Sequence, residues 1–130
     1  MSAFVDTNVL VRHLVGGPPK MAARATAYLQ RESELLVADL IVAETIYVLE
    51  SFYEVTRPAI SEAMRALIVM ESVSVVDAPL LLRAVEIYEY DRLDFAEAYL
   101  IASAESTGVM QVASFDHSID RVKSITRVEL

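Results

Sequence analysis

Short apolar runs that end at an acidic residue alternate along this chain with longer stretches of helical periodicity. The run at residues 3–5 stops at Asp6, and the run at 109–114 leads into Asp116. Runs of this length are typical of buried strands, and strands that alternate with helices build parallel sheets. The sequence therefore predicts an α/β fold with a small parallel sheet flanked by helices on both faces, in three layers.

Turn and cap residues divide the rest of the chain into elements. Residues 16–19, Gly-Gly-Pro-Pro, break the chain after the first strand, and Asp77 followed by Pro79 has the pattern of a helix cap. Apolar residues at helical spacing predict the helices, and β-branched or alternating runs predict the strands. We expect helices at 21–31, 40–53, 59–70, 80–90 and 92–104, the last closed by Gly108, and strands at 3–5, 35–38, 73–76, 109–114 and 126–129.

Length and composition limit the class of protein. The 130 residues suit a single domain, residues 1–130, and the absence of Cys excludes disulfides, thiolate metal sites and a thiol nucleophile. A net charge of −8 argues against nonspecific nucleic-acid binding by charge alone, although a bound divalent cation can present positive charge to phosphate. No apolar stretch reaches the roughly 20 residues that a membrane span needs, and no secretion signal is visible, so we expect a cytoplasmic protein.

Asp6 and Glu44 each have a functional and a structural interpretation. An Asp before a helix is by itself more often an N-cap, but an acid at the carboxyl end of a strand lies where open α/β sheets carry their chemistry. Glu44 is expected on the apolar stripe of helix 40–53, between Ile41 and Val48, where a carboxylate must be paired, protonated, hydrated or bound to metal. The alternative for Glu44 is a position at the rim, or an ion pair with Arg.

Asp94 and Glu97 open a helix three residues apart, and Asp116 follows the last inner strand. The Asp-x-x-Glu pattern is a variant of the capping box and can exist only to start the helix. A carboxylate that begins a helix behind a strand nevertheless lies at the sheet edge, so the two interpretations are compatible. Asp120 has local basic neighbours and is left outside the site.

Acids at these positions predict a metal site, because several nearby carboxylates repel one another unless protons or a cation balance them. Oxygen ligands favour Mg²⁺ or Mn²⁺, whereas neither His13 nor His117 has a partner at zinc-like spacing. One or two such cations suit phosphodiester hydrolysis. Asn8 and Ser114 are candidates for orienting ligands or water around the site.

Four segments together resemble the successive motifs of the PIN domain, specifically of the VapC-type toxins. They are Val5-Asp6-Thr7-Asn8-Val9-Leu10, Ala43-Glu44, Asp94-Phe95-Ala96-Glu97-Ala98-Tyr99 and Ser114-Phe115-Asp116. The resemblance covers essentially the whole chain in the right order. It implies a Mg²⁺- or Mn²⁺-dependent endoribonuclease, usually a homodimer, inhibited by a cognate antitoxin and often directed at tRNA or ribosomal RNA.

By this resemblance, Asp6, Glu44 and Asp116 match metal-site acids and Ser114 matches a small hydroxyl residue. The departure is Glu97, where the family nearly always has Asp. Its extra methylene could shift a metal ion or require a bridging water, and Asp94 could compensate. Our predicted catalytic and metal-binding set is therefore Asp6, Glu44, Asp94, Glu97 and Asp116.

One alternative function remains open, and two other classes of protein are excluded. A catalytically weak or inactive PIN-like module that binds protein stays open because of Glu97. A phosphoacceptor receiver domain needs adjacent acids after its first strand and a Lys after its last inner strand, and neither is present. An Asp-x-Asp phosphatase is excluded because residue 8 is Asn.

Overall fold

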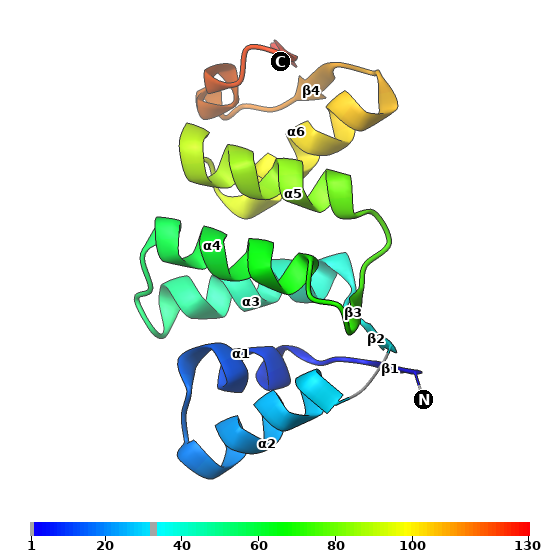
Figure 1. The fold of residues 1–130 in the computed structure, drawn as a ribbon. Helices are drawn as coiled ribbons and strands as arrows, with labels where there is room; N and C mark the ends of the chain where they lie inside the picture. The colour runs from blue at the N-terminus through cyan, green and yellow to red at the C-terminus, as the bar shows by residue number, and fades with distance from the viewer. Residues whose placement is uncertain (1, 32–33) are drawn as a thin grey trace. The chain divides into compact units, whose positions relative to one another are not determined.

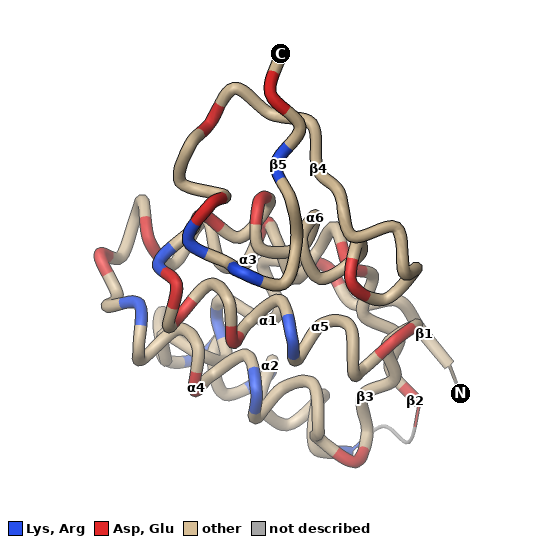
Figure 2. The backbone as a smooth tube through the Cα atoms, turned by 90° about the horizontal axis from the view of Figure 1, so that it is seen from above, with Lys and Arg blue, Asp and Glu red and all other residues tan. Residues whose placement is uncertain are grey.

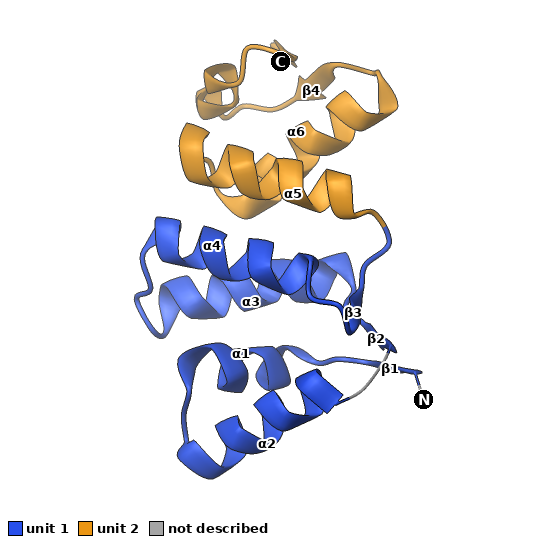
Figure 3. Ribbon diagram, viewed as in Figure 1, with its two compact units in different colours: residues 1–76 blue, residues 77–130 orange. Residues whose placement is uncertain are grey.

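The computed structural model of the chain describes residues 2–31 and 34–130. The chain divides into two compact units, Met1–Val76 and Asp77–Leu130 (Figure 3), and each unit is described by itself. The prediction of a single domain stays a prediction. Among the described residues, no helix is long and apolar enough to cross a membrane.

The first unit is built around a three-stranded parallel sheet in the order β1-β2-β3 (Figure 1). Ser2 pairs with Glu34, and Leu36 pairs with Ser74. Helices α1 and α2 pack together, and α3 packs against α1 and α4. The elements of this unit are β1 (Ser2–Phe4), α1 (Thr7–Val15), α2 (Pro19–Arg31), β2 (Glu34–Leu36), α3 (Asp39–Ser51), α4 (Arg57–Ile68) and β3 (Val73–Ser74).

Apolar side chains of the helices and of the central strand fill the core of this unit. Leu10 of α1, Leu29 of α2 and Leu35 of β2 are completely buried. Helix α4 also turns its apolar face inward, with Ile60 and Met64 fully buried. Burial of this kind is the main favourable term in folding, so the face of α4 contributes to the monomer core.

The second unit pairs two helices with a two-stranded parallel sheet, β4-β5. Helix α5 packs along α6, and the Tyr88 and Phe95 rings meet edge to face with centroids 6.2 Å apart. The elements are α5 (Ala78–Glu86), a π-helical turn (Ile87–Asp91), α6 (Phe95–Thr107), β4 (Gln111–Ala113), a 3₁₀ turn (His117–Arg121) and β5 (Thr126–Val128).

Local signals in the sequence act as predicted at several boundaries. Asp77 accepts a hydrogen bond from the Leu80 amide at 3.1 Å and so caps α5. Gly108 ends α6 with φ of 78°, in the left-handed region that glycine adopts without strain. Gly16 ends α1 in the same way, with φ of 79°.

The α/β class with parallel strands is confirmed, and the differences lie in single elements. Helix α1 was not predicted, and the helix expected at 21–31 begins at Pro19. The helix expected at 80–90 is interrupted, because the chain changes to π-helical geometry after Glu86. The final strand is β5, and it pairs with β4 in register from Gln111↔Thr126 onward.

Candidate active site

Asp6 lies where β1 has ended and α1 begins. Its backbone is extended (φ −86°, ψ 158°), and its Oδ1 accepts a hydrogen bond from the Thr7 amide at 2.8 Å. Asp6 is therefore the N-cap of α1, as the structural interpretation predicted. It is also exposed at the carboxyl end of a parallel strand, so the cap places a charged group at the edge of the sheet.

Glu44 is held by a residue next to Asp6. The Thr7 hydroxyl donates a hydrogen bond to Glu44 Oε1, and Thr7 itself is buried, with 7% of its surface exposed. A buried β-branched side chain has little rotational freedom, so this bond fixes one carboxylate oxygen relative to α1. We call Asp6 and Glu44 the acid pair.

The stripe that helical spacing predicts for α3 consists of Leu40, Ile41, Val48, Leu49 and Phe52, and it is only partly right. Leu49 is buried, but Leu40 and Phe52 are 78% and 77% exposed, and Glu44 is also exposed. The buried face consists instead of Val42, Thr45, Ile46 and Leu49. Glu44 therefore occupies the rim position that was its alternative interpretation, and no burial of charge has to be explained.

A hollow of about 350 Å³ lies beside the acid pair. Its polar lining includes Asp6, Asn8 and Glu44, and Arg12 adds a guanidinium group. The Arg12 Nε is buried without a hydrogen-bond partner among the described residues, while Nη1 donates to the Gly17 carbonyl at 3.4 Å. This hollow thus brings two carboxylates, an amide and a cation to one surface of the first unit.

In the second unit, Asp94, Glu97 and Asp116 come together and are called the acid trio. Asp94 is the N-cap of α6, and its Oδ1 accepts from the Glu97 amide at 2.8 Å. The helix-starting interpretation of Asp94 is thereby confirmed. The Glu97 side chain interacts with both Asp94 and Asp116, so the predicted grouping of these three acids is present as well.

The backbone amide and the carboxylate of Asp116 are each fixed by a hydrogen bond. Its amide donates to Ser114 Oγ at 2.9 Å, and its Oδ1 accepts from the Ser118 amide at 2.9 Å, capping the 3₁₀ turn. Hydrogen bonds from Ser118, together with one from Glu97, lower the Asp116 pKa to about 2. Ser114 therefore positions Asp116 through its main chain.

Glu97 carries the proton within the acid trio. Its burial, its hydrogen bond with Asp116 and the charge of Asp94 raise the pKa of Glu97 to about 7. A carboxyl group with such a pKa is half protonated near neutral pH and can donate that proton to the Asp116 carboxylate. The trio is therefore a place where one positive charge, a proton or a cation, relieves the repulsion between acids.

The chemistry of these residues fits a hard divalent cation, because all of them are oxygen ligands. The chain has 19 acidic and 11 basic residues, and Figure 2 shows both kinds distributed along the backbone. Within residues 2–31 and 34–130, however, no group of three His, Cys, Asp or Glu side chains is arranged as a ready metal site.

Sequence reasoning missed several residues that position the acids. Thr7 donates a hydrogen bond to Glu44, and Ser118 donates hydrogen bonds to Asp116. A single Thr or Ser does not change the hydrophobic periodicity of a sequence, so the pattern did not reveal these roles. The structure also places one arginine near each cluster of acids. Arg12 lines the hollow beside the acid pair, and the charge of Arg121 contributes to the low pKa of Asp116.

Comparisons with known proteins identify one family. The model of the PIN domain matches residues 3–125. Among solved structures, the chain is similar to Mycobacterium tuberculosis VapC20, described as a sarcin-ricin loop cleaving toxin, with 18% identity over 92% of this chain and 93% of that chain and a TM-score of 0.43. No curated relative matches the sequence.

Proposed function

Because this chain belongs to the PIN-domain family, we propose that it is a divalent-metal-dependent endoribonuclease. The observation that carries the proposal is the family match over residues 3–125, which includes every acid of the acid pair and the acid trio. Proteins of this family are in general nucleases. The two clusters of carboxylates support the assignment, since they are the ligands that Mg²⁺ and Mn²⁺ prefer.

We propose that both acid clusters are required for the reaction. Asp6 and Glu44 in the acid pair, and Asp94, Glu97 and Asp116 in the acid trio, are the residues that would hold Mg²⁺ or Mn²⁺. Such a cation would lower the pKa of the attacking water and would stabilise negative charge on the leaving oxygen. Glu97 differs from the other four acids, because it holds a proton that a metal ion has to displace.

Other residues of the chain orient the acids. Thr7 fixes one oxygen of Glu44, and Ser114 and Ser118 fix the backbone and the carboxylate of Asp116. Asn8 lines the hollow next to the acid pair, where an amide can bind water or a phosphate oxygen. These contacts hold the carboxylates in place before a ligand arrives, which reduces the entropy lost on binding.

We further propose that the protein is the toxin of a toxin–antitoxin pair and acts on structured RNA in the cytoplasm, with tRNA or ribosomal RNA as the substrate class. The motif resemblance to VapC-type toxins supports this part of the proposal. It also supports a homodimer and control by a cognate antitoxin protein. Expression of the chain alone is expected to arrest growth, and co-expression of a cognate antitoxin protein is expected to restore growth.

The test is cleavage of structured RNA by the full chain with Mg²⁺, with Mn²⁺ and with EDTA. We expect cleavage only with metal, and loss of at least about 100-fold in Asp6→Asn and Asp116→Asn. Asn is as good an N-cap as Asp, so both variants are expected to stay folded. Glu62→Gln removes one exposed acid of α4, outside both clusters, and serves as the matched control. Equal cleavage by wild type and Asp6→Asn would overturn the catalytic assignment.

Metal binding has a readout that does not depend on activity. Mn²⁺ is expected to raise the midpoint of thermal unfolding of the wild type, and to raise it less in Asp116→Asn. A protein that binds its antitoxin but neither cleaves RNA nor responds to metal would instead be the protein-binding module that Glu97 left open.

A further inference from the structure

A second cavity of the first unit, larger than the hollow beside the acid pair, also has Asp6 in its lining. It has a volume of about 710 Å³ and is lined by β1, α1 and α2. We call it the α2 groove. Asp6, Asn8 and Arg12 line both this groove and the 350 Å³ hollow beside the acid pair. The groove therefore lies next to Asp6, an acid on which the proposed chemistry depends.

Charge in the α2 groove differs from that of the whole chain. The net charge of the protein is −8 and only 11 residues are Lys or Arg. Three of these, Arg12, Arg24 and Arg31, line the groove, against a single acid, Asp6. A local excess of arginine in an acidic protein indicates an anionic ligand, and guanidinium groups match phosphate oxygens in geometry.

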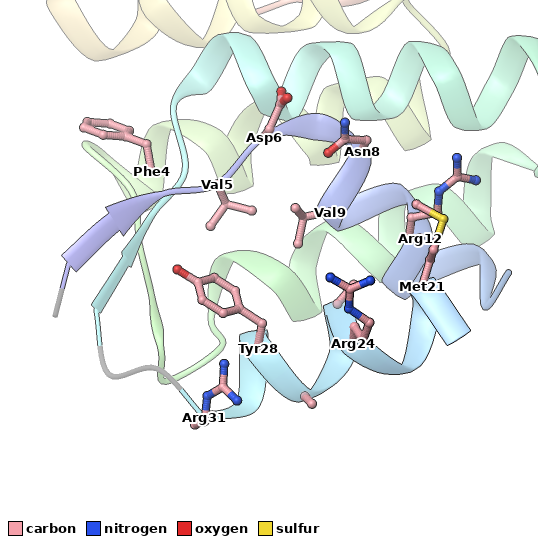
Figure 4. A pocket seen from close by; sticks show the side chains of 12 residues that line it. Phe4, Val5, Asp6, Asn8, Val9, Arg12, Met21, Arg24, Tyr28 and Arg31 are labelled. Atoms are coloured by element: carbon pink, nitrogen blue, oxygen red, sulfur yellow. The ribbon is translucent and has the colours of Figure 1, made fainter. Parts of the chain in front are cut away.

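Aromatic and apolar side chains form the rest of the wall. Figure 4 shows Tyr28 and Arg24 projecting from α2 toward Val5 and Val9. The Arg31 guanidinium lies 5.8 Å from the centre of the Tyr28 ring, on its face. Phe4 at the mouth is 74% exposed and Met21 is 48% exposed, so apolar surface faces solvent here. A ligand with a flat apolar part and an anionic part could contact both the aromatic and apolar side chains and the arginines of the groove.

We propose that the α2 groove binds an unpaired segment of the RNA substrate, with a base on Tyr28 and phosphates on Arg24 and Arg31. Proteins that bind single-stranded nucleic acid combine aromatic stacking surfaces with a basic track along the backbone, and the groove has both. Its connection to Asp6 leads the bound strand to the acid pair. This inference rests on the proposed ribonuclease function and adds which face of the first unit receives the substrate.

The spacing along α2 supports one continuous binding surface. Arg24, Tyr28 and Arg31 stand at i, i+4 and i+7, which places them on one face of the helix. The buried residues Ala22, Ala25 and Leu29 hold an adjacent side of α2 against the core, and Ala25 also lines the groove. The binding residues therefore project from a helix that is anchored by its own packing.

The experiment measures RNA binding apart from cleavage. A fluorescein-labelled, unstructured oligoribonucleotide is titrated with the full chain in EDTA, and anisotropy is followed at several salt concentrations. We expect Arg24→Gln and Tyr28→Leu each to weaken binding roughly tenfold, and Tyr28→Phe to keep the wild-type affinity because the stacking face remains. Arg24→Gln is also expected to reduce the salt dependence by about the 0.7 units of one phosphate contact to a single strand.

Lys20→Gln is the matched control, because it removes one positive charge from an exposed position of the same helix outside the groove. We expect it to bind within about twofold of the wild type. If Lys20→Gln weakens binding as much as Arg24→Gln, only net charge matters and the proposal is wrong. The proposal is equally wrong if the wild type does not bind, or if Tyr28→Leu binds as well as the wild type. Circular dichroism checks that each variant is folded.

Failure of this inference is distinguishable from failure of the proposed function. If the wild type cleaves RNA and the groove variants bind and cleave it equally well, the ribonuclease stands and the groove assignment falls. If the wild type binds RNA through the groove but never cleaves it, the groove stands and the nuclease falls. If the variants lose affinity for the antitoxin and not for RNA, the groove is a protein-binding site and the proposal is overturned.

Discussion

The buried hydroxyl of Thr7 donates a hydrogen bond to the exposed carboxylate of Glu44, 37 residues further along the chain. The donor belongs to the first turn of α1 and the acceptor to α3. We expect Thr7→Val to lower RNA cleavage by about 10- to 100-fold, because residues that orient a ligand commonly have effects of this size. Thr7→Ser keeps the hydroxyl and is expected to keep most of the activity. Steady-state cleavage kinetics measure both.

Stability separates this role from a purely structural one. The bond ends on an exposed group, so Thr7→Val is expected to change the free energy of unfolding by no more than about 1 kcal/mol. A large loss of stability in parallel with the loss of cleavage would mean that Thr7 supports the fold and not the position of Glu44.

The pKa of Glu97 predicts a pH dependence of stability in the metal-free protein. The folded protein holds this proton up to a pKa of about 7, whereas the ordinary value is 4.5. Between these values the folded state binds more protons than the unfolded chain, so the contribution of Glu97 is complete below pH 4.5 and is lost as the pH rises toward 7. Urea unfolding in EDTA across this range should show it.

Glu97→Gln is the control for that measurement, since it cannot titrate. Relative to this variant, the wild type is expected to lose stability as the pH rises. Asp116 acts in a different window, because its pKa of about 2 lies below the ordinary 3.8, and its contribution is lost only as the pH falls through that acidic range. Parallel curves for the wild type and Glu97→Gln between pH 4.5 and 7 would contradict the assigned pKa.

Shortening the side chain at position 97 tests its part in the reaction. We expect Glu97→Asp to keep or increase cleavage, because the carboxylate is retained at the length that the family normally has. Glu97→Ala is expected to reduce cleavage at least tenfold. The N-cap of α6 is Asp94, so neither change removes the cap. Wild-type activity in Glu97→Ala would assign this residue to the start of the helix alone.

A second carboxylate, Glu105, is predicted to serve stability. Arg83 binds it through Nε and Nη2 at 2.8 and 3.0 Å, and the Ser124 hydroxyl donates to it as well. These hydrogen bonds, the one to Arg83 being the largest effect, lower the pKa of Glu105. We expect Glu105→Gln to decrease the free energy of unfolding by about 1 kcal/mol, as measured by urea denaturation.

Glu86→Gln is the comparison for this prediction. Glu86 also pairs with Arg83, but its side chain is 54% exposed, against 19% for Glu105. Exposed ion pairs contribute between nothing measurable and about 1 kcal/mol, so this variant is expected to lose less stability than Glu105→Gln. If both variants lost the same free energy of unfolding, the more buried ion pair, Arg83–Glu105, would contribute no more to stability than the exposed pair, Arg83–Glu86.

Local chemistry made much of the fold predictable. Asp77 before Pro79, and Gly108 after a helical run, act through their own backbone, so their roles can be recognised without knowing their neighbours. Helix α1 was not predicted, although the N-cap interpretation of Asp6 implies a helix at that point. The 3₁₀ turn after Asp116 is too short for a periodic pattern.

The error at Glu44 has a different cause. Helix α3 carries apolar side chains nearly all round, so periodicity cannot show which face is buried. Leu40 fits the pattern as well as Val42 does, yet only Val42 is buried. The grouping of Asp94, Glu97 and Asp116 could be predicted because each stands at an element end, whereas the hydroxyl of Thr7 meets Glu44 only through tertiary structure.

Three of the five acids, Asp6, Asp94 and Asp116, hold the first amides of a helical segment. The hydrogen bond that starts each segment is also the one that aims the carboxylate. In an unfolded or partly folded chain these amides bind water, and the acids have no fixed direction. For the proposed ribonuclease function, this means that the carboxylates are aimed only once the secondary structure has formed, so a partly folded chain is expected not to cleave RNA.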